Sequence, residues 1–333
     1  MSSGRSNTNK LLFVLSVDTE EEFDWSGAFP QGECCVDNIK LLPEFHQFCQ
    51  QLGVRPTYLV DYPVAASPDS AAILRQILAT ADAEIGAHLH PWCTPPIEGA
   101  NSERESHVIN LPESLIRQKL DVLIRAIQDN VGVKPQVFRT GRWGIDGKVL
   151  KVLIDYGFKV DSSVYPYYEN QYFSCMDACD TPYWPDLQQP NVPGVQRDIF
   201  ELPITSGFNR PNFSMWGKMH SAISAPWLSG LRLVGLAWHT QMLRKLFLSP
   251  ELSTAEDMIS LVKASMASGK PVIHMFLHSS TLLEGMGEYN HHNVGRHDLY
   301  ARIRSVVEFL QGAADVEFCT ITEAADRLRP PED

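Results

Sequence analysis

The sequence lacks the cysteine pattern of a disulfide-stabilised protein. Its seven cysteines are an odd number, they include no Cys-x-x-Cys pair, and the adjacent Cys34 and Cys35 cannot easily share an ordinary disulfide. We therefore expect reduced, partly buried thiols. Internal repeats and low-complexity tracts are also missing.

Positive charge is scarce as well. The chain has 28 Lys and Arg residues against 40 Asp and Glu residues, which gives a formal net charge of -12. An acidic surface repels phosphate groups, so nucleic acid and anionic lipid are not expected as partners.

No long apolar run is present. The run Leu11–Val17 follows a polar N-terminus and ends at Asp18. It is too short to cross a membrane, and no small-residue cleavage site follows it. We therefore expect a buried strand, no integral membrane segment and a cytoplasmic location.

What the sequence does contain is an alternation of strand and helix patterns along 333 residues. Short apolar runs predict strands at Leu11–Val17, Pro56–Val60, Glu84–Leu89, Gln136–Arg139, Phe158–Asp161, Ile199–Ile204, Pro271–Leu277 and Val316–Ile321. Helical periodicity predicts helices at Val36–Leu52, Ser70–Thr80, Leu115–Asn130, Ile145–Tyr156, Ala255–Ser268 and Asp298–Gly312. This alternation indicates an α/β fold with a parallel sheet, and its length favours an irregular (β/α)7–8 barrel.

We expect a single barrel domain over residues 1–333, with a core of about 11–328 and an insertion of about 165–248. Pro166–Val195 has no clear period and reads as a long loop. Ser221–Leu248 is strongly apolar and reads as helical, with Trp227 and Trp238 expected in the core or in an oligomer contact.

Local signals mark several helix boundaries. Gly53 and Gly157 each stand between a helix pattern and a strand pattern, which is typical of a C-terminal cap. Ser253-x-x-Glu256 has the form of a capping box and predicts a helix start.

Acidic and histidine side chains cluster at the predicted strand ends. Asp18 and Glu20 follow the first strand and point the same way in an extended chain, as do His88 and His90 at the end of the third. Two imidazoles at this spacing commonly chelate a zinc-type ion. A solvated acidic turn and two unrelated histidines are the alternatives.

Two further strands end in chemically active residues. Arg139 ends the fourth strand and can pair with a carboxylate, although an ordinary surface salt bridge is an alternative. His278 follows the seventh strand, whereas His274 lies deeper and is expected to be a hydrogen-bonded core histidine. Because parallel strands end at one rim of a barrel, we expect one site there.

The order and content of these motifs resemble the polysaccharide deacetylase (NodB-homology) family of carbohydrate esterases. The resemblance covers about Leu11 to Leu328. Its motifs are Ser16-Val17-Asp18-Thr19-Glu20, Ile85-Gly86-Ala87-His88, Phe138-Arg139-Thr140-Gly141, Phe158-Lys159-Val160-Asp161-Ser162-Ser163 and Leu277-His278. The family's usual Asp-Asp pair is absent, and Trp92 stands where its second histidine falls. The blend looks most like members linked to bacterial surface-polysaccharide biosynthesis.

The resemblance implies a role for each residue. Asp18 would be the base, Arg139 would orient it, and His278 would be the general acid. Glu20, His88 and His90 would hold a divalent metal, expected to be Zn²⁺, with His90 replacing the missing histidine. Trp25, Trp92 and Trp143 each follow a motif and could form a sugar-stacking floor, although ordinary packing explains them almost as well.

We therefore expect a metal-dependent hydrolase that removes N-acetyl groups from an amino sugar of a polysaccharide or its precursor. One alternative is a hydrolase of a non-sugar C–N amide bond or of a glycosidic bond. A second is a catalytically inactive carbohydrate-binding protein. An oligomer is compatible with the sequence.

Overall fold

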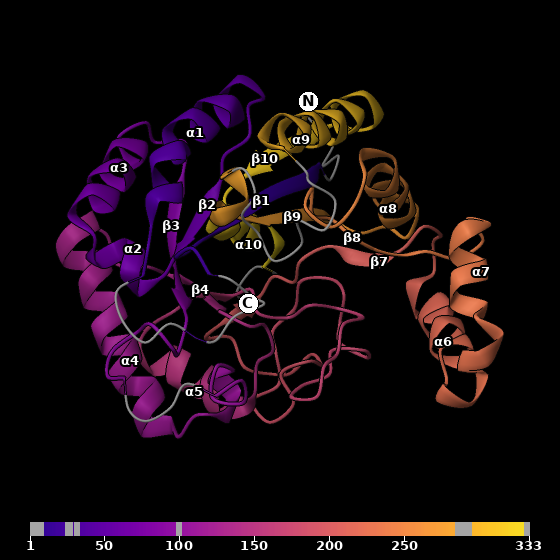
Figure 1. The fold of residues 1–333 in the computed structure, drawn as a ribbon, viewed down its shortest axis with the longest axis horizontal. Coiled ribbons are helices and arrows are strands. Elements are labelled where there is room, and N and C mark those ends of the chain that lie inside the picture. The colour runs from indigo at the N-terminus through magenta and orange to yellow at the C-terminus, as the bar shows by residue number, and fades with distance from the viewer. Residues whose placement is uncertain (1–9, 24–28, 30–33, 98–101, 284–294, 330–333) are drawn as a thin grey trace, which may run out of the picture.

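The protein is described by a computed structural model covering residues 10–23, 29, 34–97, 102–283 and 295–329. Its centre is an eight-stranded parallel sheet that curls into a half-barrel (Figure 1). The strands are β1 (Leu11–Thr19), β2 (Thr57–Val60), β3 (Glu84–Leu89), β4 (Val137–Thr140), β5 (Val160–Asp161), β6 (Phe200–Glu201), β9 (Val272–His278) and β10 (Val316–Cys319). All eight predicted strands contribute to it, and the predicted α/β distorted-barrel fold is confirmed.

Strand β1 organises the sheet because it has neighbours along its whole length. On one side it pairs with β9, from Leu12↔Val272 to Asp18↔His278. On the other side its first half pairs with β10 and its second half with β2. Residues of β1 from Leu12 onward are buried, as expected for an apolar strand covered on both faces.

Helices cover the outside of the sheet (Figure 1). Those between the strands are η1 (Asp37–Leu41), α1 (Leu42–Gln51), α2 (Tyr62–Ala66), α3 (Pro68–Leu78), η2 (Val108–Asn110), α4 (Glu113–Ala126), η3 (Ile127–Val131), α5 (Gly147–Asp155), α8 (Ala255–Ala267), η5 (Ser279–Leu282) and α9 (Arg296–Ala313), and α10 (Ile321–Leu328) follows the last strand. Gly53 and Gly157, just beyond α1 and α5, have φ of 74° and 81°. Both predicted glycine caps are confirmed, since only glycine adopts this left-handed region without strain.

Two predicted boundaries are wrong. Thr254, not Ser253, caps α8 by accepting a hydrogen bond from the Asp257 amide, while the Ser253 hydroxyl donates to the Phe247 carbonyl. The capping box lies instead at the start of α10, where Thr320 and Glu323 bond reciprocally. Ile321 therefore begins a helix and does not end the last strand.

The chain between β5 and β9 departs from the strand–helix alternation. Residues 162–199, all of them described, form no helix or regular strand, which confirms the predicted loop. Beyond β6, the antiparallel pair β7 (Ser206–Phe208) and β8 (Lys245–Phe247) holds the two ends of a helical protrusion. The protrusion consists of α6 (Phe213–Ile223), η4 (Pro226–Leu231) and α7 (Leu233–His239) and stands apart from the sheet in Figure 1. The prediction of helix up to Leu248 is wrong at β8.

None of the described helices is both long and apolar enough to span a bilayer.

Candidate active site

The predicted active-site residues at the strand ends come together at one rim of the sheet. Register alone makes two of the contacts, because Asp18 lies opposite His278 and His88 lies opposite Arg139 in adjacent strands. Glu20 is the first residue after β1, and His90 is the first residue after β3. All six side chains are buried or nearly so, and His278 is the most open at 9 %.

Glu20, His88 and His90 form a group that could hold a metal ion. One donor atom from each lies within 4.8 Å of the other two. The Nε2 atoms of His88 and His90 are 3.4 and 3.3 Å from one Glu20 oxygen, which is too long for a good hydrogen bond. Both are buried and have no hydrogen-bond partner among the described residues. Unpaired buried nitrogens are costly, and a cation among them would supply the missing partner.

The charge state of Glu20 suits a cation ligand. Burial alone would raise its pKa, but the charge on His278 and the nearby His88 and His90 nitrogens outweigh burial and lower the pKa. The carboxyl is therefore an anion facing two imidazoles. A carboxylate with two imidazoles and an open position is a common catalytic zinc donor set.

A second set of residues orients His90. Its Nδ1 lies 2.8 Å from a Glu21 oxygen, and the Trp92 indole N–H donates to the other Glu21 oxygen at 2.6 Å. A proton on Nδ1 leaves the lone pair on Nε2, which faces Glu20. Gly141 makes room for this ring, because a Cβ on Gly141 would lie 2.0 Å from His90 Cδ2.

Glu21, Asp61, His90 and Cys93 make a second group with metal-ligating atoms. Most of its donors are already engaged: Asp61 accepts the Glu21 and Val64 amides, and Glu21 holds His90 and Trp92. Burial and the adjacent Glu21 raise the pKa of Asp61 well above its usual value. This group therefore fits a supporting shell for His90 better than a separate metal site.

Asp18 is held by the fully buried Arg139. One guanidinium nitrogen donates to Asp18 Oδ1 at 2.6 Å. Three further N–H groups, on Nε and Nη2, donate to the Ser16 hydroxyl and to the hydroxyl and carbonyl of Ser162, each at 2.9–3.0 Å. Every branch of Arg139 is thus fixed, which leaves the other Asp18 oxygen facing His278 at 3.7 Å.

His278 is in turn held by Glu251, which the sequence did not single out. One Glu251 oxygen accepts the His278 amide at 2.5 Å, and the other lies 2.9 Å from Nδ1. Burial lowers the pKa of His278, but the Glu251 charge and then the Glu20 charge outweigh burial and raise it well above the usual value. The two carboxylates therefore favour the protonated imidazole, which can give up a proton from Nε2.

The three predicted sugar-stacking tryptophans differ in position. Trp92 is 2 % exposed and stacks on His90, with ring centroids 4.1 Å apart, which leaves little surface for a sugar. Trp143 is partly buried, and the Arg139 guanidinium carbon lies over its ring, 4.8 Å from the ring centroid. Trp25 lies outside the described residues.

Several interactions at the site had no signal in the sequence. Glu251 lies in the loop before α8, and Asp61 caps α2, so neither belongs to a strand-end motif. Glu21 was one acid in a run of acids. His274, by contrast, is a confirmed core histidine, since its two nitrogens lie 3.2 Å from the Pro203 carbonyl and 2.9 Å from the Ser16 hydroxyl.

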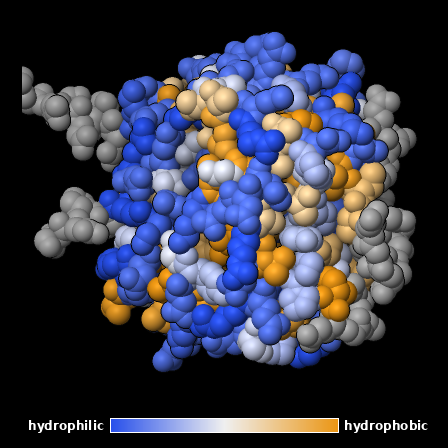
Figure 2. All heavy atoms as spheres, turned by 90° about the vertical axis from the view of Figure 1, so that its left-hand side faces the viewer, coloured by the Kyte–Doolittle hydropathy of each residue, from blue (hydrophilic) through white to orange (hydrophobic). Residues whose placement is uncertain are grey.

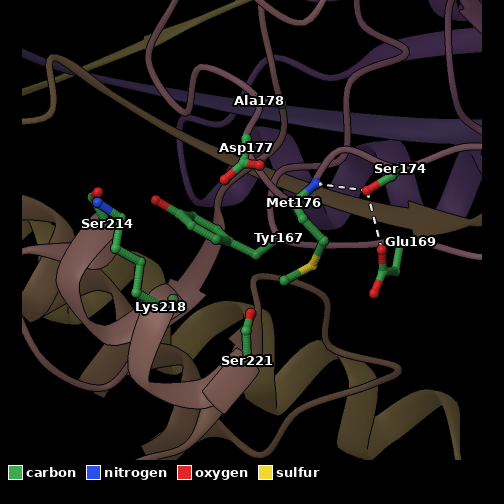
Figure 3. Close-up of a pocket in the computed structure, with 10 residues that line it drawn as sticks. Tyr167, Glu169, Ser174, Met176, Asp177, Ala178, Ser214, Lys218 and Ser221 are labelled. Atoms are coloured by element: carbon green, nitrogen blue, oxygen red, sulfur yellow. Dashed lines mark hydrogen bonds between the residues drawn. The ribbon is translucent and has the colours of Figure 1, made fainter. Parts of the chain in front are cut away.

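A cavity of about 590 Å³ lies elsewhere, between residues 167–178 and α6 (Figure 3). Its lining includes Tyr167, Glu169, Asp177 and Lys218 and no residue of the strand-end cluster. We therefore do not assign it to the candidate active site.

Comparisons with known proteins agree on the fold. No protein-family model and no curated protein matches the sequence. A candidate polysaccharide deacetylase from Mycobacterium smegmatis is 16 % identical, with 98 % of this chain and 96 % of that chain covered and a TM-score of 0.51. The 4-alpha-glucanotransferase from Thermococcus litoralis is 12 % identical, with 97 % of this chain and 41 % of that chain covered and a TM-score of 0.50.

A more distant match is a family 4 acetyl xylan esterase from Clostridium thermocellum, in complex with a cobalt ion. It is 14 % identical, with 95 % of this chain and 90 % of that chain covered and a TM-score of 0.43. The match to the Mycobacterium smegmatis protein shows that the chain has the distorted α/β barrel of a polysaccharide deacetylase fold. Identities this low define a fold and leave the activity to be argued from the site.

Proposed function

We propose that the protein is a metal-dependent hydrolase that removes N-acetyl groups from an amino sugar of a polysaccharide or its precursor. The observation that carries the proposal is the convergence of two units at one rim. One is the Glu20–His88–His90 donor group with its unpaired nitrogens, and the other is Asp18 between Arg139 and His278.

Glu20, His88 and His90 would hold the divalent cation, with Zn²⁺ as the expected ion. When bound, the cation would supply Lewis-acid polarisation of an acyl carbonyl and make a neighbouring water more acidic. The residues fit this role because Glu20 is anionic and the two Nε2 atoms are unpaired.

The chain's own residues would move the protons. Asp18, fixed by Arg139 on one oxygen, would accept the proton of the attacking water on the other. His278, held protonated by Glu251, would donate from Nε2 to the departing amine nitrogen. The C–N bond breaks, and the products are acetate and a free amino sugar. General acid–base help of this kind is worth about 10²–10⁴-fold in rate.

The first experiment is the metal content of protein purified without chelator. We expect about one zinc-type ion per chain, lost in the His88→Ala/His90→Ala double variant. Acetate release from N-acetylglucosamine oligomers is then compared between wild type, Asp18→Asn and Asp315→Asn, a matched change at an exposed surface carboxylate. Asp18→Asn should abolish acetate release and keep the metal, whereas Asp315→Asn should keep both acetate release and the metal.

Other outcomes favour the alternatives. Release of a product from small cyclic amides or glycosides, without acetate from N-acetyl sugars, would favour another hydrolase on the same barrel. Sugar binding without any release would favour an inactive carbohydrate-binding protein. Full activity of Asp18→Asn would remove Asp18 from the base role.

A further inference from the structure

The helical protrusion, taken here as residues 209–245, runs from the end of β7 to the first residue of β8. It contains most of the exposed large apolar side chains. Ten such side chains are exposed in the described structure, and seven of them belong to the protrusion. They are Met215, Met219, Trp227, Leu231, Leu236, Trp238 and Met242. Trp227 is 82 % exposed, so the expectation of a core position for it is wrong. A patch of this kind on one element indicates a binding surface.

The protrusion also has a charge opposite to that of the whole protein. No Asp or Glu occurs between Glu201 and Glu251, although the chain contains 40 of them. The same stretch contains five cations, namely Arg210, Lys218, Arg232, Arg244 and Lys245. The net charge of -12 therefore hides a separate cationic and apolar element.

Several of these cations are available to a partner. Arg244 is paired with Asp257 at 2.5 Å, and Lys245 is half-buried. Arg210, Lys218 and Arg232 are exposed, and none of the three forms an ion pair with a described residue. Arg210 also donates to the Met242 carbonyl, and Lys218 lines the cavity that contains Glu169 and Asp177. All three residues nevertheless keep exposed surface.

The helices are too short to cross a bilayer and suited to lie on one. At 1.5 Å per residue, α6 and α7 measure about 16 and 10 Å, against about 30 Å of hydrocarbon. α7 contains no buried residue and no Lys, Arg, Asp or Glu, and α6 places Met215 and Met219 on one stripe. By contrast, the face over α2, α3 and α4 is mainly hydrophilic (Figure 2).

We infer that the protrusion docks the protein on an anionic lipid surface, with Trp227, Leu231 and Leu236 in the headgroup–acyl boundary and its cations among the headgroups. Exposed tryptophan and leucine beside lysine and arginine are the composition that interfacial elements use. A second copy fits less well, because a two-fold contact of this patch with itself would bring the same cations together without a carboxylate.

The test is sedimentation with vesicles of phosphatidylcholine alone and of equimolar phosphatidylcholine and phosphatidylglycerol. We expect binding to the anionic vesicles that weakens as salt is added. The Lys218→Gln/Arg232→Gln variant should lose about 25-fold in partitioning, since each cation near an anionic leaflet is worth about 1 kcal/mol. The Trp227→Ser/Leu231→Ser variant should lose about tenfold or more.

Val192→Ser/Val195→Ser is the matched control, because these valines are exposed outside the protrusion. It should bind vesicles like wild type, and circular dichroism should show that all variants are folded. No sedimentation with either vesicle, equal binding to neutral and anionic vesicles, or full binding by folded Trp227→Ser/Leu231→Ser would each overturn the inference. A dimer in light scattering that Trp227→Ser abolishes, without vesicle binding, would assign the surface to a second copy. No substrate is used, so the result is independent of the proposed hydrolase activity.

Discussion

Replacing Arg139 by methionine should destabilise the protein strongly, because it would leave the Asp18 carboxylate buried without its main partner. Arg139 and Asp18 are 0 and 2 % exposed at their side chains, and their closest atoms are 2.6 Å apart. Removing one partner of such a pair costs about 3–5 kcal/mol. For a chain of 333 residues that corresponds to a fall of roughly 4–7 °C in the unfolding midpoint.

The double variant Asp18→Asn/Arg139→Met separates the buried charge from the lost packing. Because the double variant has no Asp18 carboxylate, its free energy of unfolding should be about 2 kcal/mol higher than that of Arg139→Met. A coupling of this size is expected of residues in contact. Thermal unfolding of both variants is followed by circular dichroism. Because methionine fills much of the arginine volume, the recovery reports mainly on charge.

A matched control exists on the surface. Arg117 and Asp155 are also 2.6 Å apart, but their side chains are 34 and 56 % exposed. Arg117→Met should therefore cost only about 0–1 kcal/mol. Equal losses in Arg139→Met and Arg117→Met, or a double variant as unstable as the two single changes added together, would refute the reasoning.

Two further predictions test the surroundings of the site. Gly141→Ala should lower the metal content of the purified protein, because the new methyl group would meet the His90 ring. Gly312→Ala is the control and should not lower it, because Gly312 has open space around it. Full metal content in Gly141→Ala would contradict this prediction. Burial, and then the neighbouring Asp161, raise the pKa of Glu201 well above 4.5. The folded state thus favours the protonated form, so this stability is present below pH 4.5 and is lost as pH rises through the folded pKa. When the urea unfolding midpoint is measured against pH, it should fall less steeply with rising pH in Glu201→Gln than in the wild type. An equally steep fall in both proteins would count against this prediction.

The sheet could be predicted because its signals are local. A strand buried on both faces is mainly apolar, as β1 is from Leu11 to Leu15, and that run is visible in the sequence. The parallel topology also predicts which reactive side chains at the ends of such strands become neighbours. His88 and Arg139 are neighbours simply because β3 and β4 are in register.

The supporting contacts could not be predicted because they join distant segments. Glu251 reaches His278 across 27 residues, and Trp92 reaches Glu21 across 71. No spacing rule relates such positions. The exposure of the protrusion could not be predicted for another reason: its apolar sequence is compatible with a core position or an oligomer contact, and only the structure reveals that Trp227 is left uncovered.

The departure of the sequence from the family pattern at Trp92 has a structural counterpart. Where the resemblance calls for a second histidine, Trp92 packs its ring on His90 and bonds Glu21, which in turn holds His90 Nδ1. The missing histidine is thus accompanied by an arrangement that aims a different histidine at Glu20. Gly141 lacks the Cβ that would meet the His90 ring, and the buried Trp92 indole N–H donates to the Glu21 carboxylate. Contacts from the ends of β1 and β4 therefore position His90 beside Glu20, as the proposed metal site requires.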